Sequence, residues 1–388
     1  MNIRLWVLVG IVAISGFSQG MILPLIAIIF EQDGISSAIN GLHATSIYIG
    51  ILLISPFLEK PLRKFGYKPI IILGGLIVLL SLFLFPFWKS LWFWFVLRLL
   101  IGIGDNMLHF GTQTWITSFS TAQNRGRNIA LYGLFFSLGF AIGPMMTRLL
   151  VINESLPFII SAGLSFAAWV TIFLLKNEIP EQDSSDATSF FGTFQRFGQV
   201  WKYAWVAFLP PFGYGFLEAT LNGNFPVYAL RIGIDINAVS IILPAFAIGT
   251  IVFQMPLGLL SDRYGRKRIL RFVMISGFFT FIVAGIFEGS EVALFSCFFI
   301  AGMLVGSTFS LGISYMADLL PKKLLPAGNI MCSVFFSFGS ITGPFIGGMM
   351  IQYAQGVSFF YLISLMLLSI FIALFFFRPQ NHEIHSYE

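Results

Sequence analysis

The segment 136–144 returns 200 residues later as 336–344, with a phenylalanine, a serine, two glycines and a proline in the same register. Each copy lies inside an apolar run long enough to form a helix. A chain that repeats itself at half its length within hydrophobic segments is predicted to form two homologous bundles of membrane helices.

Twelve apolar stretches of about 20 residues, the length that crosses a bilayer, can be marked along the chain. The residues are 57% hydrophobic and 10% charged, more apolar than a soluble core of this size requires. Backbone groups in lipid must bond within their own segment, so an all-α membrane protein is predicted. The expected spans start at Leu5, Ile39, Pro69, Leu91, Gly126 and Leu156, and at Lys202, Ala238, Ile269, Glu291, Leu325 and Val357.

The spans divide the chain into four predicted parts: a six-helix bundle (1–175), a cytoplasmic linker (176–201), a second six-helix bundle (202–378) and a cytoplasmic tail (379–388). Within the linker, residues 181–189 are polar, which is typical of a solvated segment. Phe190, Phe194, Phe197 and Trp201 then recur at helical spacing, so an interfacial amphipathic helix is predicted there, with partner binding as the alternative.

Basic residues fix the predicted orientation. Of the 22 Lys and Arg, eighteen fall on the side of the N-terminus, and Lys89, Arg148 and Arg231 fall on the other side. The remaining one, Arg98, falls inside a span. Positive residues collect in the cytoplasm, so both termini are expected there, in a protein of the cell membrane, here the bacterial plasma membrane. The net charge of +5 then reflects orientation and lipid contact, and not nucleic-acid binding.

The turn between the predicted eighth and ninth spans reads GLLSDRYGRKR over residues 258–268. Gly258 is expected to permit close helix approach, and Gly265 a tight reversal. Asp262 can cap a helix N-terminus or pair with a cation. Arg263 and Arg266 can bind lipid headgroups or bridge to neighbouring helix ends.

This turn resembles the signature loop of the major facilitator superfamily. The segment 98–104 (RLLIGIG) resembles the family's conserved-arginine motif. The repeat resembles the Gly-x-x-x-Gly-Pro-x-x-Gly-Gly pattern of the family's drug/proton antiporters. The pattern is complete in the eleventh span, whereas Met146 and Thr147 replace the last glycine pair in the fifth. Its shared members are Gly139, Gly143 and Pro144 in one copy and Gly339, Gly343 and Pro344 in the other. The repeat is interpreted either as a packing seam or as an antiport-specific gate.

The matching turn in the first half departs from the family pattern. Arg63 stands where the family has aspartate, and Glu59 stands where it has glycine. The gating salt bridge ascribed to that loop is therefore not expected in its usual form. The resemblance as a whole implies two pseudo-symmetric six-helix bundles around a central cavity, in a secondary transporter that works by alternating access.

Two acids, Asp105 and Glu218, fall near the centres of predicted spans. A charge there costs a few kcal/mol, so such residues face a cavity or a partner. Burial disfavours the charged form of a carboxyl group, which suits a group that binds and releases protons. Both are the proton-coupling candidates.

Helical spacing places Asp105 on one helix face with Arg98, His109 and Thr112, and Glu218 on another with Tyr214 and Asn222. The resemblance assigns both polar stripes to the cavity. The candidate cavity residues are Arg98, His109 and Gln113 on the fourth span, Tyr214 and Asn222 on the seventh, and Gln19, Tyr48 and Asn329 on the first, second and eleventh. Arg98 would tune Asp105 or bind an anionic group, and His109, Gln113 and Asn222 would contact substrate. The alternatives are a structural Arg98–Asp105 pair, a packing role for Glu218 and an interior hydrogen-bonded His109.

The predicted function is proton-coupled export of a small amphipathic or hydrophobic compound by a monomer in contact with lipid. A symporter or a flippase of lipid-linked substrates on the same fold is the closest alternative, and a non-transporting membrane sensor is a remote one. No catalytic constellation and no cluster with metal-ligand spacing is present in the sequence, so neither an enzyme nor a metal or cofactor site is expected.

Overall fold

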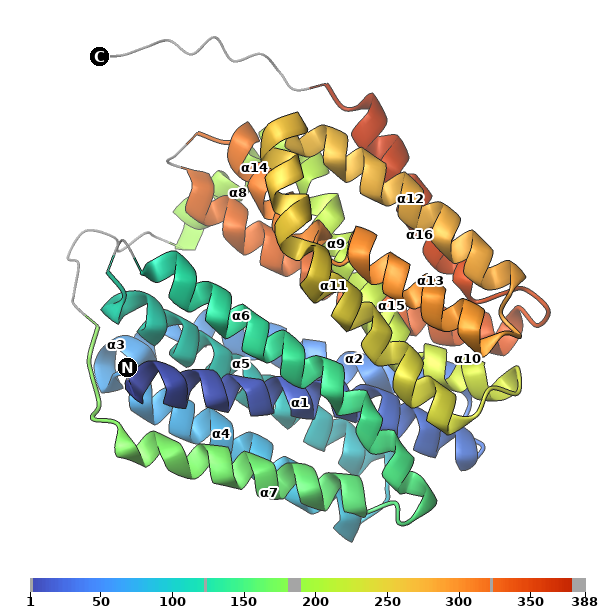
Figure 1. Cartoon of the computed structure of the whole chain (residues 1–388). Helices are drawn as coiled ribbons and strands as arrows, with labels where there is room; N and C mark the ends of the chain where they lie inside the picture. Colours follow the sequence, from blue (N-terminus) through green and yellow to red (C-terminus); the bar gives the residue numbers. More distant parts are fainter. Residues whose placement is uncertain (1–2, 122–123, 181–189, 322–323, 379–388) are drawn as a thin grey trace.

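The computed structural model describes residues 3–121, 124–180, 190–321 and 324–378, and these ranges contain helices and no strands. The first half contains α1 (Ile3–Gln32), α2 (Ser37–Ile54), α3 (Glu59–Phe65), α4 (Tyr67–Leu84), α5 (Leu91–Phe119), α6 (Arg125–Ile142) and α7 (Leu156–Thr171). The second half contains α8 (Phe190–Ala204), α9 (Leu209–Gly223), α10 (Phe225–Arg231), α11 (Ile236–Tyr264), α12 (Arg266–Ile286), α13 (Glu291–Val305), α14 (Thr308–Leu319), α15 (Leu325–Tyr353) and α16 (Phe360–Phe376). The two halves pack as separate helical bundles (Figure 1).

The helices account for the twelve predicted spans. Ten apolar segments are long enough to cross a membrane, and α16 is a shorter apolar helix. One of the ten, Glu291–Leu319, joins α13 and α14 across a break at Gly306 and Ser307. The remaining span is α9 with α10, which are separated at Asn224 and are each too short to qualify alone.

The seventh span begins later than its sequence predicts. Lys202 lies in the last turn of α8, and the span starts at Leu209. Residues 203–208 are apolar enough to extend the predicted span, but Pro210 and Pro211 occupy the first turn of α9. Proline fits the first turn and disfavours a helix running into it, so the chain starts a new helix here.

The C-terminal end of α8 packs on the second bundle. The ring of Trp201 stacks on Phe335 of α15 at 5.6 Å between centroids and on Phe208 at 6.4 Å. The polar linker segment 181–189 and the tail 379–388 lie outside the described residues. The linker's first residues contact the first bundle, where the Trp115 indole donates a 2.8 Å hydrogen bond to Glu178.

The repeated glycines make the same helix contact in each half. A Cβ atom at Gly139 of α6 would collide with the carbonyl oxygen of Ala13 on α1. A Cβ atom at Gly339 of α15 would collide with that of Phe212 on α9. Glycine is required at both positions because the backbones approach without side chains between them. The repeated glycines therefore form a close helix contact in each half, as a packing seam requires.

The two copies differ after the proline. At Pro144 the chain leaves α6 for a 3₁₀ segment, Gly143–Val151, whereas α15 continues through Pro344 to Tyr353. The Pro144 carbonyl accepts a 2.8 Å hydrogen bond from Thr147 of the same segment. The Pro344 carbonyl accepts instead from Asn224, at 3.2 Å, which approaches beside Gly347. Where Met146 and Thr147 replace the glycine pair, the proline carbonyl is bonded within its own span. Where Gly347 and Gly348 are kept, it is bonded by a residue of another span.

The bundles meet at the end opposite the linker, which we call the far end; the other is the linker end. There the Asn40 amide donates to the Gly223 carbonyl at 2.8 Å, and the Arg148 guanidinium donates to Ser240 at 2.6 Å. Arg231 forms a bidentate ion pair with Glu31, with N–O distances of 2.8 and 3.1 Å. Toward the linker end the two halves diverge (Figure 1).

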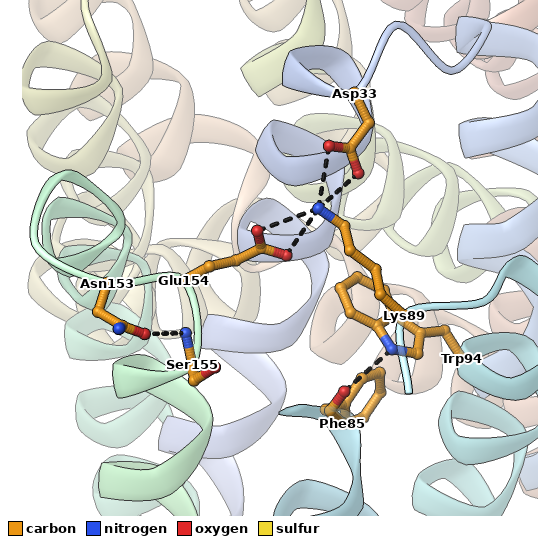
Figure 2. A network of polar contacts seen from close by, with 7 residues as sticks. All are labelled: Asp33, Phe85, Lys89, Trp94, Asn153, Glu154 and Ser155. Atoms are coloured by element: carbon orange, nitrogen blue, oxygen red, sulfur yellow. Dashed lines mark hydrogen bonds and ion pairs between the residues drawn. The ribbon is translucent and has the colours of Figure 1, made fainter. Parts of the chain in front are cut away.

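A lysine ties the loops of the first bundle together at the far end. Figure 2 shows the Lys89 ammonium between Asp33, 2.7 Å away, and Glu154, 2.9 Å away. Burial lowers the pKa of Lys89, but the bonds to both carboxylates outweigh it and leave the pKa above its ordinary value. The loops after the first, third and fifth spans are thus held to one another.

Candidate functional site

The signature turn is organised by Arg266 at the start of α12. Its guanidinium donates to Asp262 at 3.1 Å, to Asp318 of α14 at 2.6 Å and to the Ser314 carbonyl at 2.7 Å. Gly265 has φ +91°, a conformation that L side chains rarely adopt, so its predicted reversal is confirmed. The turn therefore fixes α11, α12 and α14 to one another.

One expectation for this turn is wrong. Gly258 does not make a close helix approach, because a Cβ atom there would meet nothing within 4 Å. The signature residue Arg263 lies over the adjacent Tyr264 ring, 5.5 Å from its centroid. In the first-half turn, Arg63 pairs with Glu59 at 2.6 Å within the same helix.

Asp105 lies at the centre of α5 in a polar cluster built by three helices. Its carboxylate accepts a 2.7 Å hydrogen bond from Ser15 of α1. His109, one turn further along α5, has its Nε2 atom 3.2 Å from both Ser15 and Gln19 of α1. Its Nδ1 atom lies 2.6 Å from the Tyr132 hydroxyl of α6. The cluster of Ser15, Gln19, Asp105, His109 and Tyr132 is called the Asp105 cluster below.

The burial of the fourth-span stripe matches its predicted common face. Arg98, Asp105 and Thr112 are at most 1% exposed, and His109 is partly buried. Gln113 does not join them, since its side chain is exposed. Its position just beside the stripe, about 100° from Thr112, places it outside the packed interface.

Arg98 does not pair with Asp105. Its Nη1 atom lies 3.0 Å from Nδ1 of His43 on α2, whose Nε2 atom donates to the Leu91 carbonyl at 3.1 Å. His43 is therefore neutral and accepts at Nδ1. The Nε and Nη2 atoms of Arg98 are buried and have no hydrogen-bond partner among the described residues. The structural Arg98–Asp105 pair is excluded in this conformation.

Glu218 lies between the bundles. It lines a pocket together with Tyr214 of α9, and the other walls come from α6 and α11. The remaining lining residues are Phe136, Ser137, Phe140, Phe246, Ala247 and Thr250. None of the described residues donates a hydrogen bond to the Glu218 carboxylate. The pocket is thus mostly apolar, with one acid and few other polar groups.

Of the other candidate cavity residues, some line the pocket and some do not. Tyr214 lines the pocket and stacks on Phe336 of α15. Asn222 is buried and uses its amide to donate to the Glu218 carbonyl of its own helix at 2.8 Å. Tyr48 of α2 is buried. Asn222 thus has a structural bond where a substrate contact was expected, and Asn329 is exposed outside the pocket.

Phe136 of α6 stands between the Asp105 cluster and the pocket. Its ring packs edge-on against His109, with 5.0 Å between centroids, and it also lines the Glu218 pocket. The two acids therefore occupy separate environments on either side of one aromatic side chain.

Sequence reasoning missed Ser15, His43, Tyr132 and Asp318. Ser15 and Gln19 are spaced i, i+4 on the first span, which is a signal for one polar helix face. His43 lies among other small polar residues of α2 and could have been suspected as a partner for Arg98. Nothing in the spacing of Tyr132 or Asp318 identifies their partners on other helices.

Comparisons with known proteins agree with this architecture. The family model described as Major Facilitator Superfamily matches residues 8–235 and 211–386. The chain is 58% identical to the uncharacterised MFS-type transporter YfkF of Bacillus subtilis (strain 168), over 97% of this chain and 96% of that protein. It is 25% identical to Multidrug resistance protein 1 of the same organism, over 93% of this chain and 92% of that protein.

A solved structure of the nucleoside transporter NupG has a TM-score of 0.75 to this chain, with 17% identity over 97% of this chain and 100% of that one. At that identity the likeness concerns the fold alone. The family is one of transporters, which confirms that the chain is not an enzyme. The family model and the relatives together show that this chain belongs to the major facilitator superfamily and is a multi-pass membrane transporter.

Proposed function

We propose that this transporter is a proton-coupled exporter of a small amphipathic or hydrophobic compound, with Glu218 and Asp105 as its proton-binding groups. The observation that carries the proposal is the position of Glu218 in an apolar pocket between the two bundles. Apolar walls with few polar groups are typical of sites for hydrophobic ligands.

Alternating access gives the Glu218 carboxyl two environments. Glu218 and one pocket wall belong to the second bundle, whereas Phe136 and Phe140 belong to the first. Rocking one bundle against the other would separate these walls and change the hydration of the carboxyl group. A more hydrated carboxyl releases its proton more readily, so the same motion would bind and release protons at opposite ends.

Glu218 can serve both proton and substrate. Its carboxylate has no hydrogen-bond donor among the described residues, so an ammonium or other cationic group of a ligand would supply one. Protonation would remove that attraction, so proton and cationic substrate would compete for the site. The name of a distant relative, Multidrug resistance protein 1, supports a drug-like small molecule as the substrate of this chain.

Asp105 is proposed as a second proton site, held within one bundle. The orientation with both termini in the cytoplasm would place the far end outside. The far-end bonds between the bundles would then close the outer side in this conformation.

The test is transport by the full-length protein in phosphatidylcholine liposomes, with ethidium as the probe and an internal pH dye. An exporter accumulates ethidium when the interior is acid, and ethidium entry releases internal protons. Accumulation driven by external acid would instead favour the symporter. Glu218→Gln should abolish both signals, while Glu291→Gln, at the exposed start of α13, should change neither. Normal coupled flux in both Glu218→Gln and Asp105→Asn would contradict the proposal.

A further inference from the structure

The Asp105 cluster forms a continuous series of hydrogen-bonding groups that runs from a buried carboxyl to the hydroxyl of a partly exposed residue. Asp105 is 1% exposed, whereas Tyr132 is partly exposed on α6, two turns from the linker end of that helix. The links are Asp105 to Ser15 at 2.7 Å, Ser15 to His109 at 3.2 Å, and His109 to Tyr132 at 2.6 Å.

When Asp105 is ionised, donor and acceptor roles can run in one direction along the whole chain. A carboxylate only accepts, so Ser15 must donate to Asp105. The Ser15 oxygen can then accept from Nε2–H of His109. The bare Nδ1 atom of His109 can accept from the Tyr132 hydroxyl.

When Asp105 is protonated, each link can reverse. The carboxyl O–H donates to Ser15, Ser15 donates to a bare Nε2 atom, and Nδ1–H donates to the Tyr132 oxygen. Gln19 favours this arrangement because its amide, 3.2 Å away, can also donate to the bare Nε2 atom. Every group is neutral in this second state.

We propose that Ser15, His109 and Tyr132 conduct protons between Asp105 and water on the linker side of the bundle. A proton from water joins the Tyr132 oxygen as the Tyr132 proton passes to Nδ1. The Nε2 proton passes to Ser15, and the Ser15 proton passes to Asp105. One proton enters, one carboxylate is neutralised, and no other group changes its charge. The inference rests on the proposed role of Asp105 in proton coupling.

The surroundings isolate this chain from competing charges. The titratable groups that face Asp105 are His109 and, beyond it, Tyr132, while α1 contributes the uncharged Ser15 and Gln19. Arg98, two turns away on α5, bonds to His43. Phe136 separates His109 from the Glu218 pocket, so the hydrogen-bonded path reaches Asp105 without passing through that pocket.

The test is infrared spectroscopy of the full-length protein in phosphatidylcholine liposomes. The C=O band of the protonated Asp105 carboxyl is assigned by its loss in Asp105→Asn. After transfer from H₂O to D₂O, the shift of that band measures how fast the carboxyl exchanges its proton. Ser15→Ala and Tyr132→Phe should each slow the shift by about a hundredfold, as for loss of a positioned proton-transfer group. Ser15→Thr keeps the hydroxyl and should restore the rate.

Tyr132→Phe separates conduction from support, because Tyr132 does not touch Asp105. The pH midpoint of the Asp105 band should stay unchanged in this variant while the exchange rate falls. Ser18→Ala is the matched control, since Ser18 is a buried hydroxyl of α1 that bonds to Ser161 at 3.0 Å. Unchanged exchange in both Ser15→Ala and Tyr132→Phe would overturn the conduction path alone. A band absent at every pH would overturn both the path and the coupling role of Asp105, leaving that of Glu218 intact.

Discussion

Asp105 and Glu218 are both acids at the centres of membrane spans, but they sit in opposite kinds of environment. Asp105 is held within one bundle by helices α1, α5 and α6, and Ser15 donates directly to it. Glu218 faces a pocket whose walls come from both bundles. A rigid-body motion of the bundles therefore leaves the neighbours of Asp105 in place and exchanges those of Glu218.

This contrast assigns different tasks to the two groups. A site whose neighbours do not move can hold a proton independently of the conformation. A site at the interface can respond to both substrate and conformation, because each changes what the carboxyl contacts. The comparison predicts that the two acids affect binding and coupling differently.

The largest effect is expected from neutralising each acid. Glu218→Gln should abolish both ethidium binding and ethidium-driven proton release, because the pocket loses its acceptor charge. Asp105→Asn should keep ethidium binding and lower the number of protons released per ethidium, because Glu218 remains as a proton site. Fluorescence titration of the purified variants, followed by flux in liposomes, measures both. Equal loss of binding in the two variants would remove the distinction between the sites.

The next effect concerns the close helix contacts at Gly139 and Gly339, one in each bundle. Gly139→Leu and Gly339→Leu should each destabilise the protein by about 1–3 kcal/mol, the range for overpacking, because the side chain would meet a backbone carbonyl. Thermal unfolding in detergent measures the loss. Gly163→Leu, where a Cβ atom meets nothing within 4 Å, is the control. A large loss in only one seam would show that the two halves are not mechanically equivalent.

A smaller effect should distinguish how each proline carbonyl is satisfied. Asn224→Ala removes the donor to Pro344 from another span, and Thr147→Val removes the donor to Pro144 from the same segment. Each should cost about 1 kcal/mol of unfolding free energy, as for a single buried hydrogen bond. Asn224→Ala alone should also alter ethidium binding, because Asn224 ends the helix that carries Glu218. Altered binding in Thr147→Val would contradict this division.

The smallest effect is expected at the far end. Glu31→Gln weakens the ion pair with Arg231, which is partly exposed and contributes about 1 kcal/mol or less. The opening of the far end should become up to about fivefold more frequent. The rate at which a maleimide labels Thr250→Cys in the pocket measures this opening and should rise accordingly. The protein used has its two native cysteines replaced by serine. A cysteine at Gln19 should react at an unchanged rate, since the Asp105 cluster does not cross the interface.

The sequence was sufficient to predict the twelve spans, the duplication and the common face of Arg98, Asp105 and Thr112. These features depend on hydrophobic length and helical period, which are local properties. The seam glycines were predictable for the same reason, because close approach requires a small residue wherever the partner helix lies.

The partners of the polar residues could not be predicted. Helical period gives the face of Arg98 but not the neighbour it meets, which is His43 of α2 and not Asp105. Gly258 illustrates the converse, since its match to a family motif did not reveal that no helix packs against it. The start of the seventh span was misplaced because hydropathy continues across the prolines that begin α9.

The break at Asn224 has a consequence for how the protein is made. The seventh span carries Glu218, Asn222 and Asn224, and it consists of a 15-residue and a seven-residue helix. Polar residues weaken insertion of an isolated span by the translocon. Its main packing partner, α15, supplies the Pro344 carbonyl but emerges from the ribosome about a hundred residues later. We expect the seventh span to enter the bilayer fully only after the eleventh is synthesised, which glycosylation mapping of truncated chains would measure.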